Sequence, residues 1–113
     1  MKLPNAEQAL VEREKIEDYL LNANHPFGAS KAQFFTAFGF SLANWRQLAE
    51  ALRVHGRRHS VKQMRETGFG PRYEVEGSLE APDGRSPRVR SVWQWDHGAV
   101  APRLLTAYPV EDQ

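Results

Sequence analysis

The sequence predicts an α+β domain in which helices come first and an antiparallel sheet follows. Apolar residues recur at helical spacing in the first half of the chain and alternate with polar residues in the second half. Gly, Pro and Asp residues typical of turns separate the later segments. Helices followed by strands are the usual order of α+β folds. We therefore expect N-terminal helices packed on a C-terminal meander of three to four strands.

The first two expected helices are short. One spans residues 12–22 and carries acidic residues near its start, which suit the positive end of a helix. The other follows Ser30 as a capping residue and ends at Gly39. Their apolar faces consist of Ile16, Tyr19 and Leu20 in the first helix and Phe34, Phe35 and Phe38 in the second.

A third helix is expected to begin near Asn44, because Gln47 stands three residues after this candidate cap, and to fray near Gly56. Its apolar period is carried by Trp45, Leu48, Ala49 and Leu52. We expect most of these side chains, with those of the second helix and with Val75 and Leu79, to be buried.

The clearest strand spans residues 72–79, where apolar and polar residues alternate with the period of a half-buried strand. Turn residues at 82–85 connect it to a second strand at 88–95, and a last strand at 103–108 ends before Pro109. The segment 61–66 is either a further edge strand or a frayed helix end.

Length and composition indicate one domain covering residues 1–113. The absence of cysteine excludes disulfides, thiolate nucleophiles and cysteine-bound zinc, and it is typical of a reducing compartment. No apolar run follows Met1, so neither a signal peptide nor a membrane span is expected. We expect a soluble, cytoplasmic protein without cofactor or metal.

Residues 25–31 place a lysine in the first turn of the second expected helix. The charge of Lys31 opposes the helix dipole there, which suggests that it binds a phosphate together with backbone N–H groups of residues 28–32. The alternative is a lysine that is simply solvated. His25 is a candidate acid or base near neutral pH, or an ordinary turn residue. His55 and His59, four residues apart, lack a nearby carboxylate and predict no metal site.

Residues 51–65, here called the basic stretch, contain five cations and no carboxylate, although the net charge of the whole chain is only +1. Such a run suits a nucleic-acid backbone or an acidic protein partner. The alternative is a solvated helix face. The candidate nucleic-acid-binding residues are Arg53, Arg57, Arg58, Lys62 and Arg65.

The predicted strands combine aromatic rings, hydroxyls and arginines. Trp93 and Trp95 are expected in the core, as alternating aromatic residues usually are. Thr106 and Tyr108 point to one face because they are two residues apart. Hydroxyls beside arginines suit a phosphate or a ribose. The remaining candidates on the strands are Tyr73, Arg88 and Arg90.

Several segments together resemble one bacterial family, a small uncharacterised domain that occurs alone beside a small antitoxin or at the C-terminal end of large polymorphic toxins. The resemblance covers nearly the whole chain. It is carried by Lys2-Leu3-Pro4-Asn5, Tyr19-Leu20-Leu21-Asn22, Gly28-Ala29-Ser30-Lys31-Ala32, Phe34-Phe35, Gly39-Phe40 and Pro102-Arg103-Leu104-Leu105-Thr106-Ala107-Tyr108-Pro109.

The order of elements is also similar to the barnase, EndoU, colicin and RelE-like ribonuclease fold. Those enzymes cleave RNA without metal by attack of the ribose 2′-hydroxyl on the adjacent phosphate. The resemblance implies a site on the sheet face of Thr106 and Tyr108, opposite the helix that carries Lys31. The sequence shows no His–Glu or paired-His arrangement of the kind used in that fold, so the general base stays open.

The leading hypothesis is a toxin-type, metal-independent endoribonuclease. In it, cations hold the phosphate, a proton carrier serves the 2′-hydroxyl and two hydroxyls position the ribose. These roles fall to Lys31 with Arg88 or Arg90, to His25 or Tyr73, and to Thr106 with Tyr108. The alternative is a non-enzymatic module whose basic stretch docks nucleic acid or an acidic antitoxin or immunity protein. We expect the catalytic candidates to converge on one concavity.

Overall fold

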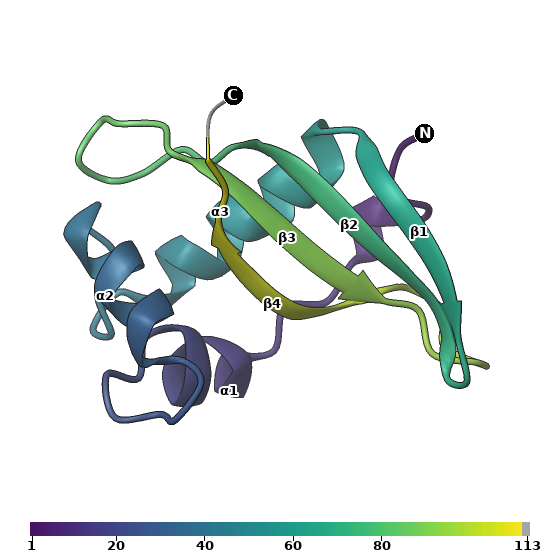
Figure 1. Ribbon diagram of the computed structural model, residues 1–113, viewed down its shortest axis with the longest axis horizontal. Helices are drawn as coiled ribbons and strands as arrows, with labels where there is room; N and C mark the ends of the chain where they lie inside the picture. Colours follow the sequence, from purple (N-terminus) through teal and green to yellow (C-terminus); the bar gives the residue numbers. More distant parts are fainter. Residues whose placement is uncertain (112–113) are drawn as a thin grey trace.

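The computed structural model describes residues 1–111 as a four-stranded antiparallel sheet with helices behind one face and beside one edge (Figure 1). The predicted α+β class and the order of helices before strands are confirmed. The elements are η1 Ala6–Gln8, α1 Arg13–Lys15, η2 Ile16–Leu20, α2 Ala29–Ala37, α3 Trp45–Arg58, β1 Val61–Thr67, β2 Gly70–Ser78, β3 Arg88–Gln94 and β4 Arg103–Pro109.

The first predicted helix is a continuous pair, α1 and η2, and η2 is a π-helical turn. The N–H of Leu21 donates to the carbonyl of Ile16, five residues back, at 2.8 Å. Widening the last turn in this way lets Ile16 and Leu20 enter the core while Tyr19 stays half-buried. This turn therefore sends one aromatic side chain outward.

Helix α2 differs from its prediction at the start and in its packing. Gly28 is the N-cap and Ser30 lies inside the helix, so Ser30 is not the capping residue. Phe35 is fully buried, whereas Phe34 and Phe38 are only partly buried. Phe38 instead lies under the guanidinium of Arg85, 4.2 Å from its ring centre, because the β2–β3 loop folds back onto the end of α2.

Helix α3 does not fray near Gly56 but continues to Arg58. The reason is tertiary: Gly56 lies directly on the ring of Trp93, where an added Cβ would be 2.6 Å from Cζ2. A glycine normally weakens a helix interior, but here it allows close contact with the sheet. Leu48 and Leu52, on the same side of α3, are fully buried in the core.

Each strand of the sheet is hydrogen-bonded to the next strand along the chain, in the order β1-β2-β3-β4. Residues 61–66 thus form an edge strand, which resolves the alternative left open by the sequence. The inner face packs against α3 and the other core residues, and the outer face is its opposite. The inner-face residues of β2, β3 and β4 are Tyr73, Val75, Gly77, Val89, Ser91, Trp93, Leu104 and Ala107.

The outer face carries the alternating polar residues of the same strands. A bulge between Val92 and Trp93 absorbs Leu105, so that Thr106 lies opposite Val92 and Tyr108 opposite Arg90. The two hydroxyl residues therefore share the outer face, as predicted from their spacing. Within the described residues, no helix is long and apolar enough to cross a membrane.

Candidate functional site

Tyr19 connects two of the predicted site residues that are far apart in the sequence. Its hydroxyl lies 2.9 Å from Oγ1 of Thr106, so η2 reaches the edge strand β4. The Lys31 ammonium lies over the same tyrosine ring, 5.5 Å from its centre. The structure thus brings Lys31 and Thr106 into contact with the same aromatic side chain, one over its ring and the other at its hydroxyl.

His25 anchors the turn before α2. Its Nδ1 accepts hydrogen bonds from the N–H groups of Phe27 and Gly28, both at 3.0 Å. Its backbone carbonyl accepts the N–H of Ala29 at 3.1 Å. The N–H of Ala32 donates to the Gly28 carbonyl at 2.8 Å, so three of the N–H groups that the sequence offered to a phosphate, those of Gly28, Ala29 and Ala32, are already bonded. Lys31 closes the turn by donating from Nζ to the carbonyl of Phe27 at 3.1 Å.

The hydrogen bonds of His25 determine its tautomer. Nδ1 can accept two N–H groups only when it carries no proton, so the ring hydrogen is on Nε2. In this state His25 can donate a hydrogen bond to a phosphate, but it has no free lone pair for a proton. The ring edge lies against Tyr19, with 4.9 Å between ring centres. The geometry therefore favours His25 as a hydrogen-bond donor that positions a phosphate over His25 as a general base.

A concavity of about 320 Å³ opens beside Tyr19 and His25. Lys15 also lies over the Tyr19 ring, 5.4 Å from its centre, so two ammonium groups contact this tyrosine. The concavity therefore combines one lysine with three carboxylates and an imidazole. Its lining residues are Glu12, Glu14, Lys15, Asp18, Tyr19 and His25.

Arg90 and Tyr108, two of the predicted site residues, interact on the outer face of the sheet. Arg90 donates from Nη1 to the hydroxyl of Tyr108 at 3.3 Å and from Nε to Glu76 at 3.0 Å. A second ion pair joins Arg90 to Glu74 at 3.3 Å. The hydrogen bond that Arg90 donates to Glu76 lowers the pKa of Glu76 below its ordinary value and raises the pKa of Arg90. Arg90 thus holds Tyr108, while its own charge is matched by two carboxylates.

Two other candidates are placed elsewhere. Tyr73 lies on the inner face opposite Trp93 and is buried, so strand alternation separates it from Thr106 and Tyr108. Burial raises the pKa of its phenol. Arg88 is exposed at the start of β3, opposite Ser78. His25, Lys31 and Thr106 therefore all contact Tyr19, and Arg90 contacts Tyr108, whereas Tyr73 lies on the opposite face of the sheet. That these residues share one concavity stays a prediction.

The basic stretch is less free than its sequence suggests, because carboxylates from elsewhere pair with it. The pairs are Arg53–Glu50 at 3.2 Å, Arg58–Glu80 at 2.9 Å, Lys62–Glu76 at 3.4 Å and Arg65–Glu74 at 3.8 Å. For Arg57, the described part of the chain shows no carboxylate partner. Three of these carboxylates follow the stretch in sequence and come from β2 or the residues after it.

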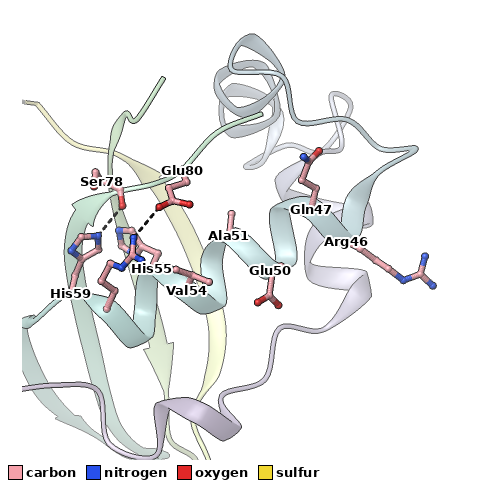
Figure 2. Close-up of a pocket in the computed structure, with 10 residues that line it drawn as sticks. Arg46, Gln47, Glu50, Ala51, Val54, His55, His59, Ser78 and Glu80 are labelled. Carbon is pink, nitrogen blue, oxygen red and sulfur yellow. Dashed lines mark hydrogen bonds and ion pairs between the residues drawn. The ribbon is translucent and has the colours of Figure 1, made fainter. Parts of the chain in front are cut away.

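His55 and His59 do come together on α3, with ring centres 4.9 Å apart, because the helix continues through Gly56. They line a pocket of about 420 Å³ between α3 and the end of β2 (Figure 2). His59 hydrogen-bonds the Ser78 carbonyl at 2.8 Å. Among residues 1–111, no three His, Asp or Glu side chains are grouped to hold a metal ion.

His55 belongs to a buried hydrogen-bond chain. Trp93 Nε1 donates to Ser91 Oγ at 2.8 Å, and Oγ lies 2.9 Å from Nδ1 of His55. Nε2 lies 2.9 Å from the Val89 carbonyl, so it must carry the hydrogen. Burial lowers the pKa of His55 to about 4. This neutral, fully bonded histidine holds α3 on the sheet.

A family profile described as "Domain of unknown function (DUF6883)" matches residues 2–111. The chain belongs to this family. The DUF6883 profile therefore spans every helix and strand described above. A comparison with curated proteins finds no significant match.

This DUF6883 domain also resembles a solved structure. It is similar to a chain of the "Contact-dependent growth inhibition toxin - immunity protein complex from Klebsiella pneumoniae 342", with a TM-score of 0.70 and 14% sequence identity. The similarity covers 95% of the present chain and 97% of that chain. It shows that the two chains share one fold across nearly their whole length.

Sequence reasoning assigned Tyr19 to an apolar helix face and so missed its contacts with Lys31 and Thr106. One signal was available: Tyr19 belongs to the same short pattern of the first helix as Ile16 and Leu20, but it alone carries a hydroxyl. The carboxylates Glu14 and Asp18 were read as helix-start acids. Only the fold shows that they surround a concavity with His25.

Proposed function

We propose that this domain is a toxin-type endoribonuclease that cleaves RNA without a metal ion, by attack of a ribose 2′-hydroxyl on the adjacent phosphate. The observation that carries the proposal is the contact of Tyr19 with both Lys31 and Thr106, because it places a cation and two hydroxyls together from three elements. Phosphoryl transfer needs such groups around one phosphate. The fold similarity to a chain of a toxin–immunity complex supports the toxin class.

The reaction forms a bond between the 2′-oxygen and phosphorus and breaks the bond from phosphorus to the 5′-oxygen. A carboxylate beside Tyr19, from Glu14 or Asp18, accepts the 2′-proton. The ammonium groups of Lys15 and Lys31 neutralise the negative charge that develops on the phosphate. Water supplies the proton to the departing 5′-oxygen. The products carry a 2′,3′-cyclic phosphate and a 5′-hydroxyl.

The hydroxyls of Thr106 and Tyr108 position the ribose from the outer face of β4. Arg90 donates to the oxygen of Tyr108, which leaves the phenolic hydrogen free to bond substrate. His25 donates its Nε2–H to a phosphate oxygen. Tyr73 has no role here, because it is buried on the inner face.

The structural neighbour is a chain of a toxin–immunity protein complex, and we propose that the present domain likewise has an immunity protein as its partner. Such a partner protects the producing cell by blocking the concavity beside Tyr19. The enzyme then acts in a cytoplasm, either that of its own cell or that of a target cell reached as part of a larger toxin.

Incubation of the purified domain with RNA, followed by analysis of the cleaved ends, tests the activity. We expect 2′,3′-cyclic phosphate ends at a rate that EDTA does not change. Lys31→Gln, Thr106→Val and Tyr108→Phe should each lower the rate by about 10²-fold, the usual contribution of one catalytic or transition-state contact. Lys2→Gln is the matched control, since Lys2 is an exposed lysine that also donates to a backbone carbonyl, that of Arg58, and belongs to neither candidate site. Controlled expression should arrest growth in the wild type and the control alone.

Cleavage at the same rate in the Lys31→Gln and Lys2→Gln variants would remove this site from the reaction. Intact RNA together with unimpaired growth would favour the alternative function, a non-enzymatic module whose basic stretch docks nucleic acid or an acidic partner. A pull-down with that partner would then depend on Arg57 rather than on Lys31.

A further inference from the structure

Phe27 is an aromatic residue that the fold leaves in water. Its residue surface is 77% exposed, although Phe35 and Phe40 from the same half of the chain are fully buried. Its ring lies 6.1 Å, centre to centre, from that of His25. A single exposed apolar residue needs no explanation by itself. The position of Phe27 within the candidate site is what distinguishes it.

The backbone of Phe27 is fixed on both sides by residues of that site. Its N–H donates to Nδ1 of His25 at 3.0 Å, and its carbonyl accepts from Nζ of Lys31 at 3.1 Å. The ring is therefore presented to solvent from an anchored turn between an imidazole and an ammonium. An aromatic surface held in this way loses little conformational freedom when a flat partner binds to it.

We propose that Phe27 stacks on the base of a nucleotide whose phosphate is bound by Lys31, so that the substrate of this site is single-stranded RNA. This inference rests on the proposed function. Bases in single strands expose a face for stacking, whereas bases inside a duplex are covered on both faces. Stacking tolerates any base, so the site should select unpaired RNA more than a particular sequence.

Phe69 provides a matched control. It is 74% exposed, close to the exposure of Phe27, and lies in the turn between β1 and β2. Figure 1 places that turn and the loop before α2 at opposite ends of the molecule. Phe27→Ala and Phe69→Ala therefore remove nearly equal areas of exposed apolar surface, but only Phe27 lies at the candidate site.

The test measures binding of a single-stranded oligoribonucleotide with 2′-O-methyl riboses, which lacks the attacking hydroxyl and cannot be cleaved. Fluorescence anisotropy is recorded for the full chain. We expect Phe27→Ala to weaken binding by about 5- to 150-fold, the usual effect of losing one base–aromatic stack. Phe27→Trp should restore binding, and Phe69→Ala should bind like the wild type. A duplex of the same sequence should bind more weakly and should not respond to Phe27→Ala.

Equal affinity of the wild type and Phe27→Ala for the single strand, equal losses in the two alanine variants, or no binding of the single strand would each overturn the inference. The proposed function fails separately. Phe27-dependent binding without RNA cleavage would refute the ribonuclease and keep the stacking site. RNA cleavage together with equal binding by the wild type and Phe27→Ala would support the ribonuclease and refute the stacking site. The exposed ring of Phe27 would then be available to contact a protein partner.

Discussion

The hydroxyl of Tyr19 lies 2.9 Å from that of Thr106, although 87 residues separate them in the chain. This contact joins the segment η2 to the last strand, β4. Because both side chains are half-buried, the bond contributes to stability as well as to positioning.

Removing this bond from either side should therefore give coupled effects. Tyr19→Phe and Thr106→Val are each expected to lower the free energy of unfolding by about 0.5–1.5 kcal/mol, as for a typical hydrogen bond. The double variant should cost less than the sum, because both changes break the same contact. Urea denaturation of the four proteins measures the coupling. Strictly additive losses would show that the contact contributes nothing in solution.

The buried His55 should make stability depend on pH. Its pKa is lowered by burial from 6.5 to about 4, with Arg88 and His59 adding smaller effects in the same direction. Between pH 4 and pH 6.5, the unfolded chain therefore binds a proton at His55 that the folded chain does not bind. The stabilisation is fully present above pH 6.5 and is lost as the pH falls toward 4, by about 3 kcal/mol.

Measuring unfolding free energies between pH 7 and pH 4 checks this dependence. His55→Gln should destabilise the protein at pH 7 and flatten its response to pH. His97→Gln, which changes an exposed histidine, should retain the wild-type slope. The same slope in the His55→Gln variant would assign the response to other groups.

Gly56→Ala should destabilise the protein even though alanine favours helices. Propensity alone would add about 1 kcal/mol of stability. The new Cβ, however, would lie 2.6 Å from Trp93 Cζ2, and relief of such overpacking typically costs about 1–3 kcal/mol in total. Gly68→Ala is the control, because no atom lies within 4 Å of its added Cβ. A thermal melt in which Gly56→Ala gains stability would contradict the packing of α3 on Trp93.

RNA binding should weaken with salt, and the individual cations should contribute unequally. Each phosphate contact in a single strand adds about 0.7 to the slope of log affinity against log salt. Lys31→Gln and Arg57→Gln should each reduce the slope by about this amount. Arg53→Gln should change it little, because Arg53 already pairs with Glu50. Equal slope changes for Arg53 and Arg57 would mean that the ion pair opens on binding.

The sequence by itself determined the fold class, the order of the elements and most of their bounds. These depend on local patterns: helical spacing around Leu48 and Leu52, alternation along β2, and turn residues between strands. The pairing of Thr106 with Tyr108 on one face also follows from alternation within a strand. Each of these features is decided by neighbours in the chain.

Only the tertiary structure decided which polar groups meet, because the partners come from distant segments. Glu74, Glu76 and Glu80 neutralise much of the basic stretch, and Trp93 explains why α3 passes through Gly56. Tyr73 alternates in phase with Val75, whose burial was expected from the sequence, and the structure shows that this face is the buried one. The contact of Tyr19 with Thr106 arises in the same way, since hydrogen bonds and ion pairs depend on distances in space that no local sequence pattern encodes.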